Sequence, residues 1–445
     1  MKNTPIDKNT PIDYDIVKSV IDQSGIEDIG KATIREIVRL IDIIEKETGQ
    51  KYIRMEMGVP GLKPSTIAIN AEKEALDRNC AASYPPLDGI PELKKETSKF
   101  IKNFMDINIS PRSCIPTSGS IMGGYATFMV AGRRDPKKDT VLFIDPGFPV
   151  HKQLVKMVGL KSDSFDVYNY RSDKLKEKLE SYLKKGNIST ILYSNPNNPS
   201  WVCFTDEELR IIGELSNKYD VIVAEDLAYF AMDFRKDLSK LGKSPFQASV
   251  AKYTDNYLIM ISTSKSFSYA GQRIGLLAIS DKLFERDFED LSRFYNTINF
   301  GYCVVQGTVY STTAGCSHSA QYGIAALLKA INNNEYNFID DIKEYGKRAV
   351  IMKDLFLSNG FKIVYDKDID EPIADGFYFT ISYPGFSGEE LIGKFLYYGI
   401  SAMALRCTGS EKTEGLRACV SQVNPSQFTD LENRLKQFHN DFKTS

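Results

Sequence analysis

The sequence predicts an α/β protein with a large domain built on a mostly parallel β-sheet and a smaller α+β domain. Three observations indicate this organisation. The chain has 445 residues, which is longer than one ordinary domain. Between about residues 71 and 337, short apolar runs alternate with amphipathic stretches, as is typical of βαβ units. From about residue 338 the pattern changes to helix, strand, helix and strand, and we expect residues 338–445 to form the smaller domain.

The N-terminal part, residues 1–70, opens with the hexapeptide KNTPID, which occurs twice in succession. We interpret this repeat as an arm, because it is short and polar and contains proline. The later stretch TIREIVRLIDIIEKETG has apolar positions at helical spacing and ends at Gly49, so it predicts a helix. We expect this part to join the smaller domain.

The large domain, residues 71–337, contains five apolar runs that we predict to be strands: TVLFIDP, STILYSNP, DVIVAED, YLIMIST and IGLLAIS. Ligands of such sheets bind beyond the carboxyl ends of the strands. The polar residues that follow these runs are therefore the candidates for a functional site. In the smaller domain, YGKRAVIMKDLFLSNG and GEELIGKFLYYG predict helices, and GFYFTIS and GLRACVS predict strands.

Composition argues against several classes of function. The formal net charge of −2 gives no electrostatic basis for binding nucleic acid or a membrane surface. No apolar run approaches the roughly 20 residues of a membrane span, and the N-terminus has no signal-peptide core. The seven cysteines are scattered without a CxxC pair, which is typical of free thiols in the cytoplasm. The three histidines are far apart in the sequence, so we expect no histidine-rich metal site. A Ser-His-Asp hydrolase would have few histidines to use, and no GxSxG motif occurs.

One lysine lies in an unusual place for a charged side chain. Lys265 lies in the turn STSKSFSYAGQR directly after the apolar run YLIMIS, and a buried ammonium is costly unless it is paired or neutral. A single lysine of this kind is most simply interpreted as one whose amine reaches water. Other chemistry-bearing residues, however, follow the neighbouring predicted strands.

Asp226 follows the run VIV, and small residues in PTSGSIMGG precede a predicted helix, where backbone N–H groups suit a phosphate. Arg273 also fits a phosphate, because a guanidinium binds it through two hydrogen bonds. Singly, Asp226 could be a helix cap, NPNNP a turn and Arg273 an ion-pair partner. Together, a phosphate site, an acid and an amine on adjacent strand ends are what a pyridoxal phosphate site requires.

From about Gly58 to Arg417, the sequence resembles the fold type I pyridoxal-phosphate enzymes, in particular the class I and II aminotransferases. The most specific part is the motif SxxK, followed by Arg273 eight residues after Lys265 and by a glycine two residues beyond. The asparagine turn and a DxxY motif occur upstream in the order typical of the family. The resemblance implies a seven-stranded, mostly parallel sheet, pyridoxal 5′-phosphate as cofactor, and a homodimer with shared active sites.

The resemblance also implies a role for each matching residue. Lys265 resembles the lysine that forms the internal aldimine, and Asp226 the carboxylate that faces the pyridine nitrogen. Tyr229 and Asn198 resemble the pair that hydrogen-bonds the phenolic oxygen. Phe148 matches the aromatic residue that stacks on the ring. The phosphate cup would consist of Ser118, Gly119, Ser120, Ser262 and Arg273, with Tyr84 reaching it from the partner subunit.

The substrate α-carboxylate would be held by Arg417, with contributions from Asn198 and the backbone of Gly58. The same resemblance predicts cis peptides at Asn198–Pro199 and Asp145–Pro146. Three features depart from the family. Trp201 replaces the glycine of the usual NPTG turn, a phenylalanine occupies position 148, and YNTINFGYC lacks an SNPP-like run.

The resemblance implies an aminotransferase that transfers the amino group of an L-amino acid to a 2-oxo acid. Two alternatives stay open at this point. One is a lyase or decarboxylase on the same fold, since fold does not decide the reaction. The other is a non-catalytic regulatory protein that keeps the fold, although the short N-terminal part has no strongly basic DNA-binding segment. The sequence does not indicate which amino acid is the substrate.

Overall fold

A computed structural model describes residue 6 and residues 8–443, so most of the first KNTPID copy lies outside the described residues. The described chain forms two compact units. The larger unit comprises Leu62–Asn197 and Cys203–Ile342. The smaller unit comprises the described residues up to Gly61, the short segment Asn198–Val202, and the described residues from Lys343. The domain boundaries that we placed at residues 70 and 337 stay a prediction.

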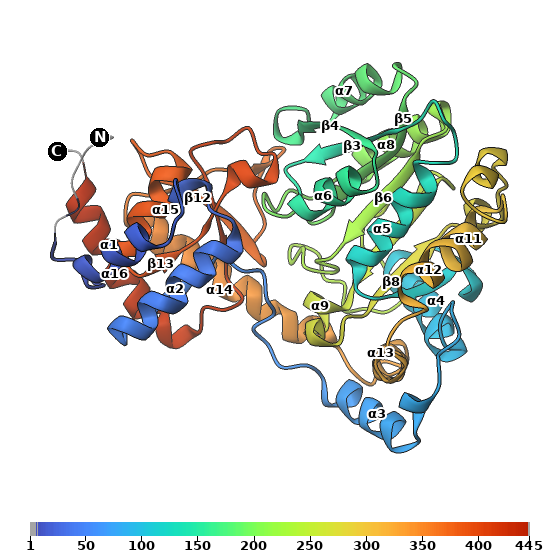
Figure 1. Cartoon of the computed structure of the whole chain (residues 1–445), viewed down its shortest axis with the longest axis horizontal. Helices are drawn as coiled ribbons and strands as arrows, with labels where there is room; N and C mark the ends of the chain where they lie inside the picture. Colours follow the sequence, from blue (N-terminus) through green and yellow to red (C-terminus); the bar gives the residue numbers. More distant parts are fainter. Residues whose placement is uncertain (1–5, 7, 444–445) are drawn as a thin grey trace. The chain divides into compact units, whose positions relative to one another are not determined.

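The larger unit contains a seven-stranded sheet with strands in the order β2–β8–β7–β6–β5–β3–β4 (Figure 1). All neighbouring strands are parallel except at β8, which is antiparallel to both β2 and β7. The prediction of a seven-stranded, mostly parallel sheet is therefore confirmed. The strands in sheet order are Cys114–Thr117, Gly275–Ile279, Tyr257–Ser262, Ile222–Leu227, Ile188–Ser194, Thr140–Asp145 and Lys161–Asp166.

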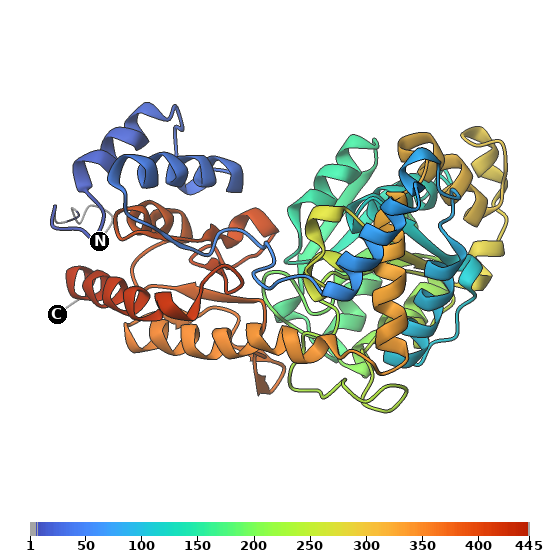
Figure 2. The same cartoon turned by 90° about the horizontal axis from the view of Figure 1, so that it is seen from below.

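Helices pack around this sheet. Helix α5 contacts several of the strands, and its side chains Phe128 and Val130 join the buried core with Phe143, Leu258 and Leu277. Helix α13 packs against α3 and α4, and these three helices lie together in Figure 2. The helices of the larger unit are α3 (Thr66–Asp77), α4 (Pro91–Met105), α5 (Ser120–Ala131), α6 (Pro149–Met157), α7 (Asp173–Leu183), α8 (Asp206–Tyr219), α9 (Thr263–Ser266), α10 (Asp281–Glu285), α11 (Phe300–Tyr302), α12 (Tyr310–Thr313) and α13 (His318–Asn332).

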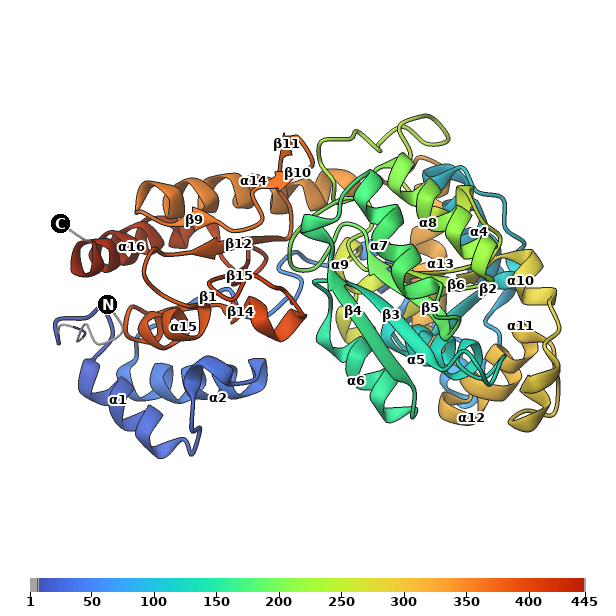
Figure 3. The same ribbon diagram turned by 90° about the horizontal axis from the view of Figure 1, so that it is seen from above.

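The smaller unit contains an antiparallel sheet in the order β14–β15–β12–β9, with bounds Met403–Ala404, Leu416–Cys419, Tyr378–Ser382 and Lys362–Ile363 (Figure 3). Its N-terminal segment is tied in by β1 (Ile53–Arg54), which pairs in parallel with β13 (Ile400–Ser401). A short hairpin of β10 (Lys367–Asp368) and β11 (Glu371–Pro372) lies nearby in sequence. The helices are α1 (Tyr14–Gln23), α2 (Ile34–Thr48), α15 (Gly388–Tyr397) and α16 (Phe428–Phe442), with α14 (Phe338–Ser358) beginning in the larger unit.

The ends of helix α2 show why the predicted segment is helical. Thr33 and Glu36 form a reciprocal capping box at its start, which satisfies two backbone N–H groups. Gly49 ends it in the left-handed conformation with φ of 70°, which costs glycine little. In the described part of the chain, no helix is long and apolar enough to cross a membrane.

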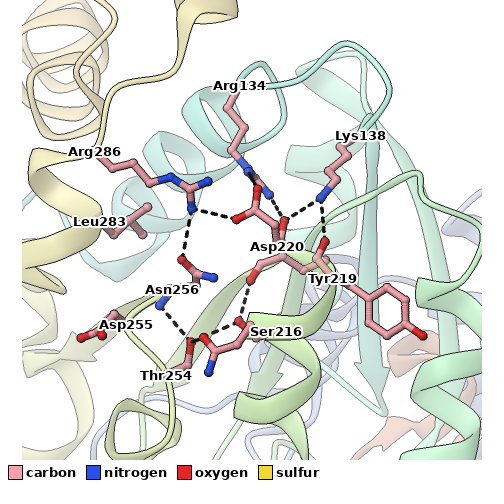
Figure 4. Close-up of polar contacts among 12 residues, drawn as sticks. Arg134, Lys138, Ser216, Tyr219, Asp220, Thr254, Asp255, Asn256, Leu283 and Arg286 are labelled. Atoms are coloured by element: carbon pink, nitrogen blue, oxygen red, sulfur yellow. Dashed lines mark hydrogen bonds and ion pairs between the residues drawn. The ribbon is translucent and has the colours of Figure 1, made fainter.

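A polar cluster around Asp220 joins three segments of the larger unit (Figure 4). Asp220 is the C-cap of α8, and its carboxylate accepts hydrogen bonds from Arg134 Nη1 at 2.8 Å and Arg286 Nη1 at 2.7 Å. Its backbone carbonyl accepts one from Lys138 Nζ at 2.7 Å. Burial alone would raise the pKa of Asp220, but the two guanidinium groups lower it instead. The Arg134 side chain is almost fully buried, so its charge depends on this carboxylate.

Replacing Asp220 with Asn is therefore expected to lower the free energy of unfolding by about 2 kcal/mol. This is below the cost of about 3–5 kcal/mol for breaking a fully buried pair, because the Asp220 side chain is 43% exposed. Denaturant-induced unfolding would measure the loss. Asp255→Asn is the control. Asp255 pairs with Lys282 and both side chains are exposed, so this substitution should change stability by less than about 0.5 kcal/mol. Equal losses in the two variants would contradict this account of the cluster.

Candidate functional site

The register of three strands brings the predicted phosphate cup together in the larger unit. Gly275, the first residue of β8, pairs with Thr117 at the end of β2 and with Ser262 at the end of β7. Ser118 follows Thr117 directly, and Arg273 lies two residues before Gly275. Segments more than 100 residues apart in sequence therefore meet at one end of the sheet.

The backbone at this point approaches too closely for larger residues. Gly119 has φ of 79°, and a Cβ atom there would lie 2.5 Å from Arg273 Nη2. A Cβ atom on Gly275 would lie 2.5 Å from the backbone nitrogen of Ser120. Gly119 is the N-cap of α5 and offers no side-chain cap, so the first amides of this twelve-residue helix can face an anion.

Arg273 supplies a positive charge beside Gly119 and the first amides of α5, and we call this group the phosphate cradle. Arg273 is exposed, and its Nη1 donates to the carbonyl of Ala270 at 2.8 Å. Among the described residues, no carboxylate lies within ion-pair distance of Arg273. A guanidinium beside helix N-terminal amides, without a protein counter-ion, is well arranged for a phosphate.

Lys265 lies in the short helix α9, which starts immediately after β7. Its side chain is partly buried, and the residues on either side hold the turn in place. Thr263 Oγ1 donates to the carbonyl of Ile274 at 2.7 Å, and Ser266 Oγ donates to the carbonyl of Phe230 at 2.9 Å. Ser262 Oγ accepts from the Ser264 amide at 3.3 Å. The lysine therefore projects from a braced turn at the end of a buried strand.

Asp226, at the end of β6, has a partner that we did not predict. His151 Nε2 lies 3.0 Å from Asp226 Oδ2, and both side chains are buried. The amide of Ala228 donates to the other carboxylate oxygen at 3.1 Å. The second ring nitrogen of His151 is buried without a hydrogen-bond partner. A signal was present in GFPVH, because His151 is one helical turn after Phe148 at the start of α6.

The aromatic residues predicted for the site are all in the larger unit. Phe148 packs edge-on against His151, with ring centroids 5.8 Å apart. Tyr229 is buried and follows β6, three residues after Asp226. Tyr84 is 87% exposed and lines a pocket of about 700 Å³ together with Ser118 and residues 313–319. The structure thus places Tyr84 at an open surface beside the first residue of the predicted cup.

The predicted carboxylate-binding residues lie in the smaller unit. Arg417 is buried in β15, its Nη1 donates to Asn198 Oδ1 at 3.3 Å, and its Nη2 donates to the carbonyl of Glu56 at 2.6 Å. The Nε–H of Arg417 is buried without a hydrogen-bond partner. Among the described residues, no carboxylate forms an ion pair with Arg417. A buried guanidinium with only neutral partners is favourable when an anionic ligand completes it.

Trp201, where we expected the loop to depart from the family pattern, is fully buried with φ of 64°. The peptides at Asn198–Pro199 and Asp145–Pro146 are both cis, as predicted. The predicted site residues therefore form two groups, one in each compact unit. Asn198, Gly58 and Arg417 belong to the smaller unit, and all others belong to the larger one.

The residues of the larger unit fit pyridoxal 5′-phosphate on structural grounds. The cradle between Gly119 and Arg273 matches the phosphate, and the buried Asp226 with His151 can face a protonated ring nitrogen. Lys265 supplies an amine for a carbonyl carbon. These three groups come from the ends of β2, β6 and β7, which is where ligands of such sheets bind.

Glu225, next to Asp226 in β6, is fully buried. Its carboxyl accepts a hydrogen bond from Tyr193 Oη at 2.9 Å and another from Ser249 Oγ. Burial raises the pKa of Glu225 to about 7. The proton on Glu225 therefore stabilises the fold fully below about pH 4.5, and this stabilisation is lost as the pH rises to about 7.

We expect wild type to lose about 2 kcal/mol of stability relative to Glu225→Gln between pH 5 and pH 8, because the glutamine does not ionise. Urea unfolding of both proteins at the two pH values would measure the difference. Glu177→Gln, an exposed position in α7, is the matched control and should leave the pH dependence unchanged. If the difference in unfolding free energy between wild type and Glu225→Gln did not change with pH, the raised pKa of Glu225 would be contradicted.

Comparison with known proteins adds independent findings. Residues 50–434 match the family model "Aminotransferase class I and II". The chain is 26% identical over 341 residues to a probable aspartate aminotransferase of Methanocaldococcus jannaschii, covering 76% of this chain and 81% of that protein. It is 23% identical over 259 residues to an aspartate aminotransferase of Sulfolobus acidocaldarius, covering 57% of this chain and 61% of that protein.

Solved structures share the fold. An aspartate aminotransferase of Thermotoga maritima superposes with a TM-score of 0.73 at 20% identity, covering 95% of this chain and 99% of the other. The protein BacF of Bacillus subtilis, solved with bound substrate, superposes with a TM-score of 0.74 at 17% identity, covering 95% and 97%.

Proposed function

This chain belongs to the class I and II aminotransferase family and is an aminotransferase, and from that premise we propose the cofactor, the substrates and the residues. The cofactor is pyridoxal 5′-phosphate, attached through Lys265. The reaction transfers the amino group of an L-amino acid to a 2-oxo acid. The observation that carries this proposal is the meeting of Lys265, the Asp226–His151 pair and the Gly119–Arg273 cradle at one end of one sheet.

The bound cofactor would supply an electron-accepting ring for the pair of electrons left when the substrate loses its Cα proton. Ser118, Gly119, Ser120, Ser262 and Arg273 would bind the phosphate. Asp226, oriented by His151, would hold a proton at the pyridine nitrogen. A unit charge pair 4 Å apart is worth about 4 kcal/mol at an effective dielectric of 20, against about 1 kcal/mol in water. The burial of this carboxylate therefore favours the protonated ring.

Lys265 would remove the substrate Cα proton through its amine and return it to the C4′ carbon of the cofactor, as general base and then acid. Tyr229 and Asn198 would hydrogen-bond the phenolic oxygen of the cofactor, and Phe148 would cover one face of its ring.

Arg417, with Asn198 and the backbone of Gly58, would bind the substrate carboxylate. The buried guanidinium with neutral partners supports this last role.

We propose further that the active form is a homodimer in which Tyr84 reaches the partner subunit's phosphate. Its 87% exposure beside Ser118 supports a contact that one chain alone does not complete. A strictly monomeric and fully active species in sedimentation would contradict this. The seven cysteines are scattered along the chain and form no disulfide in the part that the structure describes, which supports a cytoplasmic location.

The experiment that tests the function separates the two half-reactions. Purified protein loaded with pyridoxal 5′-phosphate is mixed with single amino acids, and the absorbance band is followed as the pyridoxamine form accumulates. A panel of 2-oxo acids is then used for the reverse step, with products identified by mass. Return of the original band with a new amino acid is the expected result. Release of ammonia or carbon dioxide without the pyridoxamine form would favour the lyase or decarboxylase alternative.

A further inference from the structure

Tyr378 contacts the guanidinium of Arg417 through the face of its ring. The centre of the guanidinium lies 4.5 Å from the ring centroid. The two residues are on neighbouring strands, since Arg417 of β15 pairs directly with Thr380 of β12, two residues from Tyr378. Residues i and i+2 share one face of a strand, and an aromatic ring reaches its diagonal neighbour. The contact therefore follows from the register of the sheet.

The other contacts of Arg417 leave its plane weakly determined. The hydrogen bond to Asn198 Oδ1 is long at 3.3 Å, and the carbonyl of Glu56 holds one nitrogen only. The carboxylate of Glu56 is engaged elsewhere, by Arg54 Nε at 2.9 Å and by the Ser401 hydroxyl. A guanidinium binds a carboxylate through two parallel hydrogen bonds only if its plane is right, and an aromatic face fixes that plane.

Tyr378 is itself confined on two sides. A Cβ atom on Gly58 would lie 1.9 Å from the Tyr378 hydroxyl oxygen, so the tip of the side chain abuts this backbone. Trp201 packs edge-on against the ring at 6.1 Å and 72°. The indole of Trp201 packs against the backbone of Gly376, where a Cβ atom would lie 2.1 Å from Trp201 Cε2. All these residues belong to the smaller unit.

We propose that Tyr378 is a positioning residue that sets the plane of Arg417 for the substrate carboxylate, and that Trp201 holds the Tyr378 ring in place. This role explains what the tryptophan does at a position where the family usually has glycine. The inference rests on the proposed role of Arg417 in binding carboxylate. It concerns both substrates, because the amino acid and the 2-oxo acid carry the same group.

The test compares Tyr378→Leu, which removes the aromatic face, with Tyr378→Phe, which keeps it. KM and kcat are measured for both half-reactions. Binding of the 2-methyl derivative of the substrate amino acid, which has no Cα proton to lose, is titrated separately. We expect Tyr378→Leu to raise KM and the dissociation constant of this probe about tenfold. Tyr378→Phe should stay within about threefold of wild type.

Phe379→Leu is the matched structural control. Phe379 is the next residue of β12, its side chain is on the opposite face of the strand, and it packs against Phe356. This variant should lose stability but keep its KM. If Tyr378→Leu and Phe379→Leu raise KM equally, or if Tyr378→Phe is as impaired as Tyr378→Leu, the inference is overturned.

A double-mutant cycle with Arg417→Lys separates this inference from the proposed function. If Tyr378 acts through Arg417, then Tyr378→Leu should add almost nothing to the loss caused by Arg417→Lys. Fully additive losses would overturn the positioning role while leaving the carboxylate role of Arg417 intact. An unchanged KM in Arg417→Lys alone would overturn the carboxylate role, and the inference with it.

Discussion

Replacing Lys265 with Ala is expected to reduce kcat by at least about 10⁴-fold. General acid–base catalysis by one side chain contributes about 10²–10⁴-fold, and in this protein the same amine would also attach the cofactor. No neighbouring side chain in the braced turn after β7 is a substitute, because Thr263, Ser264 and Ser266 do not carry a basic nitrogen. Single-turnover mixing with the substrate amino acid would measure the loss.

The cofactor itself should still bind to Lys265→Ala, because the phosphate cradle of Gly119 and Arg273 is intact. Borohydride reduction followed by peptide mapping gives a readout that does not depend on turnover. Wild type should yield a modified peptide at Lys265, and the variant should yield no reduced adduct. Lys282→Ala, an exposed lysine paired with Asp255, is the control and should behave as wild type. An adduct fixed to another lysine of the wild-type protein would contradict the assignment.

Apolar strands were predictable from the sequence, because burial on both faces leaves a continuous hydrophobic run. All five predicted runs are strands of the seven-stranded sheet. The edge strand β4, with the sequence KSDSFD, was not predicted. It has one neighbour, and its first residues are largely exposed, so it has no apolar run to reveal it. Its polar sequence is typical of a loop.

The candidate site was predictable where a motif has a fixed order along the chain. Ser262, Lys265 and Arg273 are such a case, because one turn carries them all. His151 and Tyr378 were not predicted, since each acts on a residue more than 30 positions away. His151 reaches Asp226 from a helix on another segment, and Tyr378 reaches Arg417 through strand register. Single-sequence patterns do not contain that pairing information.

Arg417→Lys is expected to lose about a hundredfold in kcat/KM, which corresponds to about 2.7 kcal/mol of transition-state stabilisation. The substrate carboxylate must be held so that the Cα–H bond is perpendicular to the cofactor ring, where it overlaps the π system. A guanidinium fixes this orientation through two parallel hydrogen bonds, whereas an ammonium is a point charge that does not define a plane. Lysine also cannot stack on the face of Tyr378 as a planar group does.

The loss should appear in both half-reactions, because the amino acid and the 2-oxo acid present the same carboxylate to Arg417. Cofactor retention should be unchanged, since the phosphate cradle belongs to the other compact unit. Arg348→Lys is the matched control. Arg348 is also buried in the smaller unit and donates to the carbonyls of Ser421 and Val423, so its loss should lower stability with little effect on kcat/KM. If Arg417→Lys impaired only one half-reaction, Arg417 would not be the residue that binds the carboxylate of both substrates. Because no carboxylate among the described residues pairs with the buried Arg417, another anionic ligand would then be needed to account for its guanidinium.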